Sequence, residues 1–206
     1  MIPLLHLDEV PEKAKAIRYV IYEVVRNVFE HSGSAWGAIL CAQYFKKTNT
    51  LRIGIADTGV GIKQSIEQSY SPTSDSDAIK LALTPGITGT TKRTGGTDEN
   101  AGAGLFFTKS IAYINRSFFM IYSGDAMYKL RMRDVRKPVN FLNANPLKDN
   151  HSAREDLPYW RGTVVGVDIS LDDTSEFNNL LNLIGAVYSG GVKDKRRSQY
   201  KKARFI

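Results

Sequence analysis

The sequence predicts an α+β fold: a two-layer sandwich in which helices cover one face of a largely antiparallel, mixed sheet. An amphipathic helix opens the chain, and two strand–turn–strand pairs follow at separate places. Helical segments lie between and after these pairs, without the strict alternation of a doubly wound fold. The 206 residues suffice for one sizeable domain, because a chain of this length buries about 70% of its unfolded surface.

The first half of the chain is predicted to form a helix and a hairpin. Apolar residues recur at spacings of three and four over 10–31, with Pro11 in the first turn and Gly33 in the segment that ends it. Two apolar runs, 36–45 and 51–56, flank a polar connection and predict an antiparallel hairpin. A weakly helical stretch over 62–83 follows, interrupted at 71–74.

The second half begins with a long loop over 84–100, which is rich in glycine, threonine and cations. A buried helix is expected over 105–114, a second hairpin from 118–122 and 127–132, a final strand over 163–169 and a closing helix over 176–188. Residues 134–161 are polar, contain three prolines and predict an excursion over the surface. Cys41 lies in the middle of a predicted strand, and a small apolar core residue is its simplest interpretation.

Composition excludes several classes of protein. The single cysteine permits neither an internal disulfide nor a cysteine-based zinc site, and no apolar run reaches the ~20 residues of a membrane span. We therefore expect a cytoplasmic protein without a membrane partner.

The net charge of +7 is concentrated in the last fourteen residues, where seven cations face one anion. A solvated tail explains this charge most simply, and nucleic-acid binding through the tail is a less favoured alternative.

Glu23 and Asn27 place two polar groups on one side of the first predicted helix, one turn apart. Each directly precedes a valine of the apolar stripe, so we expect both to border a cavity. A carboxamide oxygen can be a ligand of Mg²⁺, and a nearby carboxylate can orient or deprotonate a water. The alternative is a solvent-facing polar pair on an amphipathic helix.

Two glycine-containing segments complete the candidate site. Asp57 at a strand end can accept a hydrogen bond from the amino group of a purine, and the following glycines leave room for the backbone to approach the ring. An ordinary turn has the same sequence, and an aspartic protease would need a second such carboxylate from a dimer. Gly102-Ala103-Gly104-Leu105 at a helix start offers N–H groups to phosphate, with Lys92 and Arg93 in the preceding loop. Neither a Walker A motif nor a dinucleotide fingerprint is present.

The order and spacing of these segments resemble the GHKL superfamily, the histidine-kinase-like ATPases of the Bergerat fold, over about residues 10–171. Glu23 and Asn27 resemble its N box, and residues 57–61 and 102–105 resemble its two glycine boxes. Residues 84–100 lie where the family has its ATP lid, and Gly162-Thr163 is similar to its threonine element. The nearest members by pattern are stand-alone ATPases and anti-sigma-type serine kinases, although His31 and Glu30 point to different branches.

The resemblance implies an ATP-binding domain over 1–171, followed by a C-terminal helix and basic tail over 172–206. It implies that Glu23 is the general base and Asn27 the Mg²⁺ ligand. The implied nucleotide-binding residues are Asn27, Asp57, Gly59, Gly61, Lys92, Gly102, Gly104, Leu105 and Thr163. Such a domain hydrolyses ATP or transfers its γ-phosphate to a partner protein. The alternative is a non-catalytic ATP-sensing module that controls protein binding. A regulatory or substrate protein and a homodimer are the implied partners.

Overall fold

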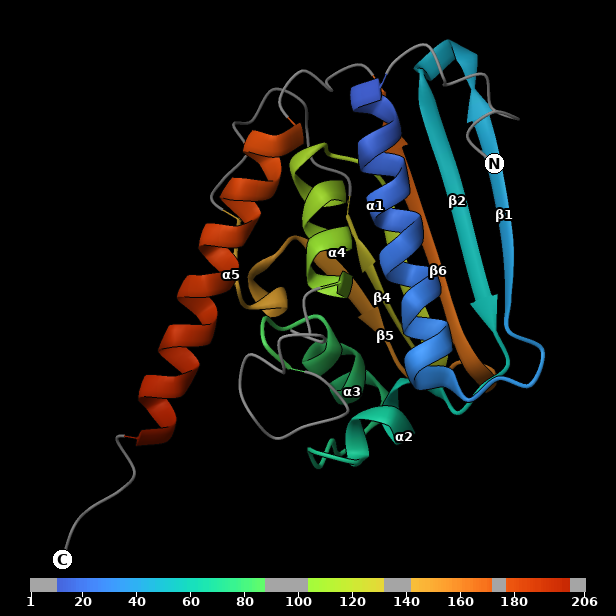
Figure 1. Cartoon of the computed structure of the whole chain (residues 1–206). Helices are drawn as coiled ribbons and strands as arrows, with labels where there is room; N and C mark the ends of the chain where they lie inside the picture. The colour runs from blue at the N-terminus through green and yellow to red at the C-terminus, as the bar shows by residue number, and fades with distance from the viewer. Residues whose placement is uncertain (1–10, 88–103, 132–141, 172–176, 201–206) are drawn as a thin grey trace, which may run out of the picture.

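The computed structural model describes residues 11–87, 104–131, 142–171 and 177–200 (Figure 1). The helices are α1 (Pro11–Asn27), the π-helical turn η2 (Val28–Ser32), η3 (Lys46–Thr48), α2 (Gly61–Glu67), α3 (Asp75–Ala82), α4 (Gly104–Ile114), η4 (Pro146–Lys148) and α5 (Phe177–Tyr200). The strands are β1 (Ala38–Phe45), β2 (Thr50–Asp57), β3 (Phe119–Gly124), β4 (Ala126–Leu130), β5 (His151–Arg154) and β6 (Trp160–Ser170).

These strands form one six-stranded sheet in the order β1-β2-β6-β3-β4-β5. Helices α1 to α4 lie over one face of this sheet, which confirms the predicted two-layer α+β sandwich (Figure 1). Every pair of neighbouring strands in the described ranges is antiparallel, so the mixed character expected from the sequence is not found there. The two predicted hairpins are β1–β2 and β3–β4, and β6 joins them by pairing with both β2 and β3.

Helix α1 forms as its apolar spacing predicts. Ile17, Val20 and Val24 recur at spacings of three and four, and all three are buried in the core. The helix continues into η2 and ends at Gly33, whose φ of +58° is in the left-handed region that favours glycine after a helix. This turn directs the chain into β1 and leaves the end of α1 beside the end of β2.

Part of the predicted surface excursion over 134–161 belongs to the sheet and the core. Residues 151–154 form the edge strand β5, and Pro146 and Asp149 are buried. Asp149 pairs with Lys109 of α4, and the side chains of both are fully buried. The polar sequence of this segment does not indicate its burial, because the residue that anchors it, Asp149, is itself charged and its partner Lys109 lies 40 positions away.

Two further expectations are corrected. The closing helix does not end near residue 188 but continues to Tyr200, so the first half of the basic tail is helical. Lysine, arginine and glutamine are good helix formers, and cations near a helix C-terminus interact favourably with its dipole. Cys41 is exposed, because its strand β1 lies at the sheet edge and this side chain points away from the helices. No helix in the described ranges is both long and apolar enough to span a bilayer.

Candidate functional site

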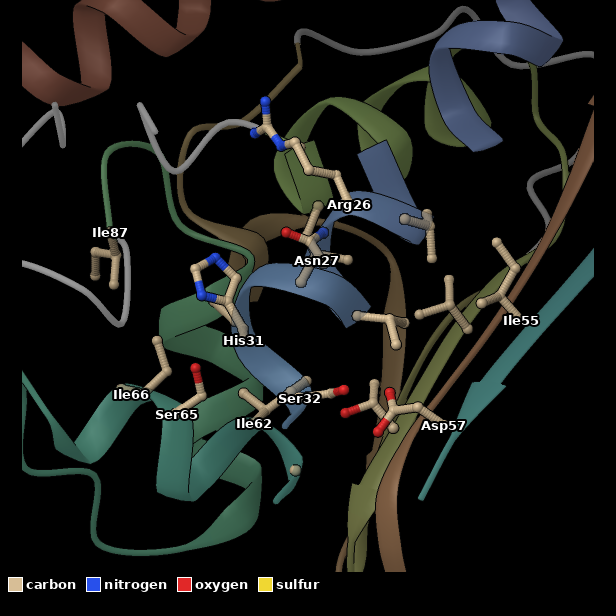
Figure 2. A pocket seen from close by; sticks show the side chains of 18 residues that line it. Arg26, Asn27, His31, Ser32, Ile55, Asp57, Ile62, Ser65, Ile66 and Ile87 are labelled. Atoms are coloured by element: carbon tan, nitrogen blue, oxygen red, sulfur yellow. The ribbon is translucent and has the colours of Figure 1, made fainter. Parts of the chain in front are cut away.

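A cavity opens on the helix side of the sheet, beside the end of α1, η2, α2 and the start of α4 (Figure 2). About 830 Å³ of atom-free space lies in and directly above it, its opening to solvent included. Its apolar lining consists of Val24, Val28, Ile55, Ile62, Ile66, Ala82, Ile87, Leu105 and Val165. Its polar side chains are Arg26, Asn27, His31, Ser32, Asp57, Ser65 and Thr163, and Gly61 and Gly104 complete it.

Asp57 is the last residue of β2 and faces the helix layer, because the buried residues of this strand alternate. Its Oδ1 accepts a hydrogen bond from the Gly59 N–H at 2.8 Å. Burial raises the pKa of Asp57, while backbone N–H groups of Gly59 and Thr163 favour the charged form and oppose this shift. These donors fix the orientation of a carboxylate that has capacity for further hydrogen bonds at the cavity.

The turn after β2 is held against η2 by a close backbone contact. The Val60 N–H donates to the Ser32 carbonyl oxygen at 2.7 Å. A Cβ on Gly59 would lie 2.1 Å from this same oxygen, so no side chain fits there. Gly61 has a φ of +78°, which favours glycine at the start of α2. The absence of a side chain at Gly59 therefore lets the backbone of η2 pack directly on this turn.

A second set of contacts ties the start of β6 to Asp57. The Ser123 hydroxyl donates to the Gly162 carbonyl oxygen at 2.8 Å and accepts from the Ile62 N–H at 2.9 Å. The Trp160 indole Nε1–H donates to the Asp57 carbonyl oxygen at 3.1 Å. Strands β2, β3 and β6 and helix α2 are thus held together next to the cavity residues Asp57 and Ile62.

Asn27 ends α1 and lines the cavity. Its side-chain nitrogen is buried, and in the described ranges it has no hydrogen-bond partner. A buried donor in this state costs free energy until a partner reaches it. The carboxamide of Asn27 is therefore suited to contact a bound molecule. Across the cavity from α1 and η2, Asp57 lies on β2 (Figure 2).

Glu23 lies one turn earlier and is buried, but it is not among the cavity-lining residues. Its Oε2 lies 3.3 Å from Arg26 Nη2, and a Cβ on Gly104 would lie 2.4 Å from Oε2. The carboxylate therefore packs on the first residue of α4. Burial raises the pKa of Glu23, the Arg26 guanidinium opposes this, and Glu30 adds to the rise.

Arg26 and His31 are cavity residues outside the predicted set of site residues. The Arg26 guanidinium contacts Glu23 and also Glu30, with Nε 3.5 Å from the Glu30 Oε1. A signal for Arg26 exists in the sequence, since acidic residues stand three positions before it and four after it. Burial lowers the pKa of His31, against the opposing effect of Glu30, and this favours a neutral imidazole at neutral pH.

The structure brings together residues that lie far apart in the sequence. Asn27, Asp57, Gly61, Gly104, Leu105 and Thr163 line the same cavity. Glu23 and Gly59 lie behind its wall, against Gly104 and Ser32 respectively. Gly102 and Lys92 lie outside the described residues, as does most of the loop over 84–100.

Within the described ranges, no group of three or more His, Cys, Asp or Glu side chains is arranged to hold a metal ion. A metal at this cavity would therefore take most of its ligands from a bound molecule and water.

Comparisons of the sequence with protein-family models and with curated proteins found no match.

Proposed function

We propose that the cavity binds ATP together with Mg²⁺, and that the chain is an ATPase or protein kinase of the GHKL type. The observation that carries this proposal is the convergence of Asn27, Asp57, Gly104 and Thr163, from four separate elements, on one cavity. Each is a residue that the motif pattern assigns to the nucleotide. Chance matches to short motifs would have no reason to meet in space.

The adenine end of the proposed site is at Asp57. Its carboxylate would accept the exocyclic amino group of the ring, a charge-assisted hydrogen bond. The walls of this part of the cavity are apolar. One wall is formed by Ile55 of β2 and Val165 of β6, and the other by Ile62 of α2. Thr163, next to Asp57 through its backbone N–H, supports the same end. A flat, largely apolar ring with one amino group fits this combination.

The phosphate end of the proposed site lies between Asn27 and the start of α4. The first N–H groups of an eleven-residue helix favour anionic oxygens, and Gly104 begins that helix. The unpartnered Asn27 Nδ2 is a donor that would bond a phosphate oxygen. The Oδ1 of the same carboxamide would be the protein ligand of Mg²⁺, since this ion is commonly held by one or two protein ligands and the phosphates of the substrate. When bound, Mg²⁺ neutralises charge on the phosphate oxygens.

Glu23 is the proposed general base. In hydrolysis it would take a proton from water as the water oxygen bonds to the γ-phosphorus and the bond to ADP breaks. In phosphotransfer the hydroxyl of a regulatory or substrate protein would replace the water. We expect this activity in the cytoplasm. One observation favours the second candidate, a non-catalytic ATP sensor: Glu23 is paired with Arg26 and packed on Gly104 instead of lining the cavity.

Nucleotide binding and turnover, measured on the same samples, test these proposals. We expect calorimetry to detect Mg-ATP binding by the wild-type protein and Asn27→Ala to weaken it. We expect Glu23→Gln to retain binding and to abolish ADP release, whereas Glu67→Gln, at an exposed position of α2, serves as the control and changes neither. Absence of ATP binding would refute the proposal. Tight binding without turnover by the wild-type protein would establish the sensor in place of the enzyme.

A further inference from the structure

Buried polar atoms without a hydrogen-bond partner in the described ranges lie close together at the end of α1. They are Glu23 Oε2, Arg26 Nε and Asn27 Nδ2. A folded protein contains few such atoms, because each costs free energy while it lacks a partner. An anionic ligand at this end of the cavity would give partners to the two donors among them, Arg26 Nε and Asn27 Nδ2.

Arg26 is the cation of this group, and its contacts with carboxylates are long. Its Nη2 lies 3.3 Å from Glu23 Oε2, and its Nε lies 3.5 Å from Glu30 Oε1. Charge-assisted N–H···O bonds are normally about 2.7 to 2.9 Å long. In this structure, Arg52 makes two such bonds of 2.8 Å to Asp168. The contacts of Arg26 are longer than these, so its guanidinium keeps N–H donors for a further acceptor.

Arg26 also lies at the end of the cavity where we place the phosphates. It lines the cavity next to Asn27, and Figure 2 shows Asn27 between Arg26 and Asp57. The carboxylate that Arg26 contacts, that of Glu23, packs on Gly104 at the start of α4. Among the described lining residues, Arg26 is the one with a permanent positive charge. A guanidinium suits a phosphate group, which it can bind through two parallel N–H···O bonds.

We propose that Arg26 binds the γ-phosphate of ATP and leaves Glu23 to do so. This inference rests on the proposed function, in which the cavity binds ATP and Glu23 is the general base. ADP lacks the γ-phosphate, so Arg26 stays on Glu23 when ADP is bound. Arg26 thus distinguishes the triphosphate from the diphosphate, and the base is released only beside a phosphate that can be transferred. The pairing of Glu23 with Arg26 is then the resting arrangement of the enzyme.

Calorimetric titration with Mg-ATP and with Mg-ADP tests the role of Arg26. We expect Arg26→Gln to lower the affinity for ATP at least about tenfold, because a charge-assisted contact is lost, and to leave the affinity for ADP within about threefold. Arg18→Gln removes the same charge from an exposed position of α1, is the matched control and is expected to change neither affinity. Arg26→Lys keeps the charge but not the paired donors, so the affinity for ATP should fall about three- to tenfold with that for ADP unchanged. This variant carries the test if Arg26→Gln does not fold.

Crystal structures with Mg²⁺ and a non-hydrolysable ATP analogue, and with Mg-ADP, test the exchange of partners. In the first we expect nitrogen atoms of Arg26 about 2.7 to 2.9 Å from γ-phosphate oxygens and out of contact with Glu23. In the second we expect the contact between Arg26 and Glu23 to be retained. An Arg26 side chain that stays on Glu23 in both structures would overturn the inference.

The outcomes separate this inference from the proposal on which it rests. If the wild-type protein binds ATP, and Arg26→Gln weakens ATP and ADP equally or weakens neither, the role of Arg26 is wrong and the proposed ATP site stands. A wild-type protein that binds neither nucleotide would overturn both.

Discussion

Replacing Asp57 with Asn removes one negative charge and keeps the size of the side chain. In the native protein the Gly59 N–H is bonded to one carboxylate oxygen at 2.8 Å. In Asp57→Asn this N–H needs the single remaining oxygen, so the new NH₂ group would take the position of the other oxygen. That group is a donor, and the adenine amino group is also a donor. The variant therefore loses the proposed hydrogen bond instead of weakening it.

A hydrogen bond with a charged partner is worth about 1.5 to 3 kcal/mol, so the affinity for ATP is expected to fall about 10- to 150-fold. The assay is calorimetric titration with Mg-ATP, with Asp125→Asn as the control, because Asp125 lies in the β3–β4 turn and does not line the cavity. Asp57→Asn is expected to fold, because two effects on stability oppose each other. The single remaining oxygen serves the Gly59 and Thr163 N–H groups less well, whereas removal of the charge is favourable, since burial raises the pKa of Asp57 above its ordinary value and the ionised carboxylate costs the folded state stability at neutral pH. Unchanged affinity in a folded Asp57→Asn variant would refute the reasoning and leave the turn after β2 as a turn only.

Three further predictions concern stability. Gly59→Ala is expected to lower the free energy of unfolding by about 2 kcal/mol or more, because its Cβ would lie 2.1 Å from a backbone oxygen. Gly185→Ala in α5 is the control: its Cβ meets nothing within 4 Å and should raise the free energy of unfolding by about 0.5 to 1 kcal/mol. Urea unfolding measures both variants, and equal effects would contradict the contact at Gly59. Asp149→Ala should cost about 3 to 5 kcal/mol by leaving the Lys109 charge buried, and a double variant, Lys109→Met with Asp149→Leu, should recover most of it in the same assay; no recovery would show that the pair acts beyond its charge. Glu23→Gln should raise the free energy of unfolding at pH 8 and lose this gain below pH 4.5, since the raised pKa makes the ionised side chain unfavourable to the folded state above that pH; a pH-independent difference would contradict this.

Local periodicity was enough to predict most elements of the fold. The apolar spacing over 10–31 predicted α1 with η2, and the polar connection at 46–50 predicted the β1–β2 hairpin, because these signals depend only on neighbouring residues. The interruption at 71–74 predicted the division between α2 and α3, where the Ser74 hydroxyl accepts the Asp77 N–H at 3.2 Å as a helix cap. The motif pattern also selected residues that prove to share one cavity.

The features that sequence reasoning missed depend on contacts between distant parts of the chain. The short strand β5 has little apolar signal of its own and is placed by pairing with β4 and by the burial of Asp149. Arg26 has the pattern of a surface ion pair, and only the position of η2 shows that it reaches the cavity. Cys41 looks like a core residue because either face of a strand gives the same alternation until the position of the helix layer is known.

The indole bond between Trp160 and the Asp57 carbonyl gives the protein an optical reporter at its own cavity. The chain has two tryptophans, and the other, Trp36, is 91% exposed and has the environment of an indole in water. Trp36→Phe would therefore remove most of the solvent-exposed emission at little cost to the fold, leaving a single fluorophore whose Nε1 lies 3.1 Å from the backbone of Asp57. Movement of the turn after β2 when a molecule enters the cavity would then change the emission of Trp160 directly, so that binding can be followed with unlabelled ligand and at stopped-flow speed.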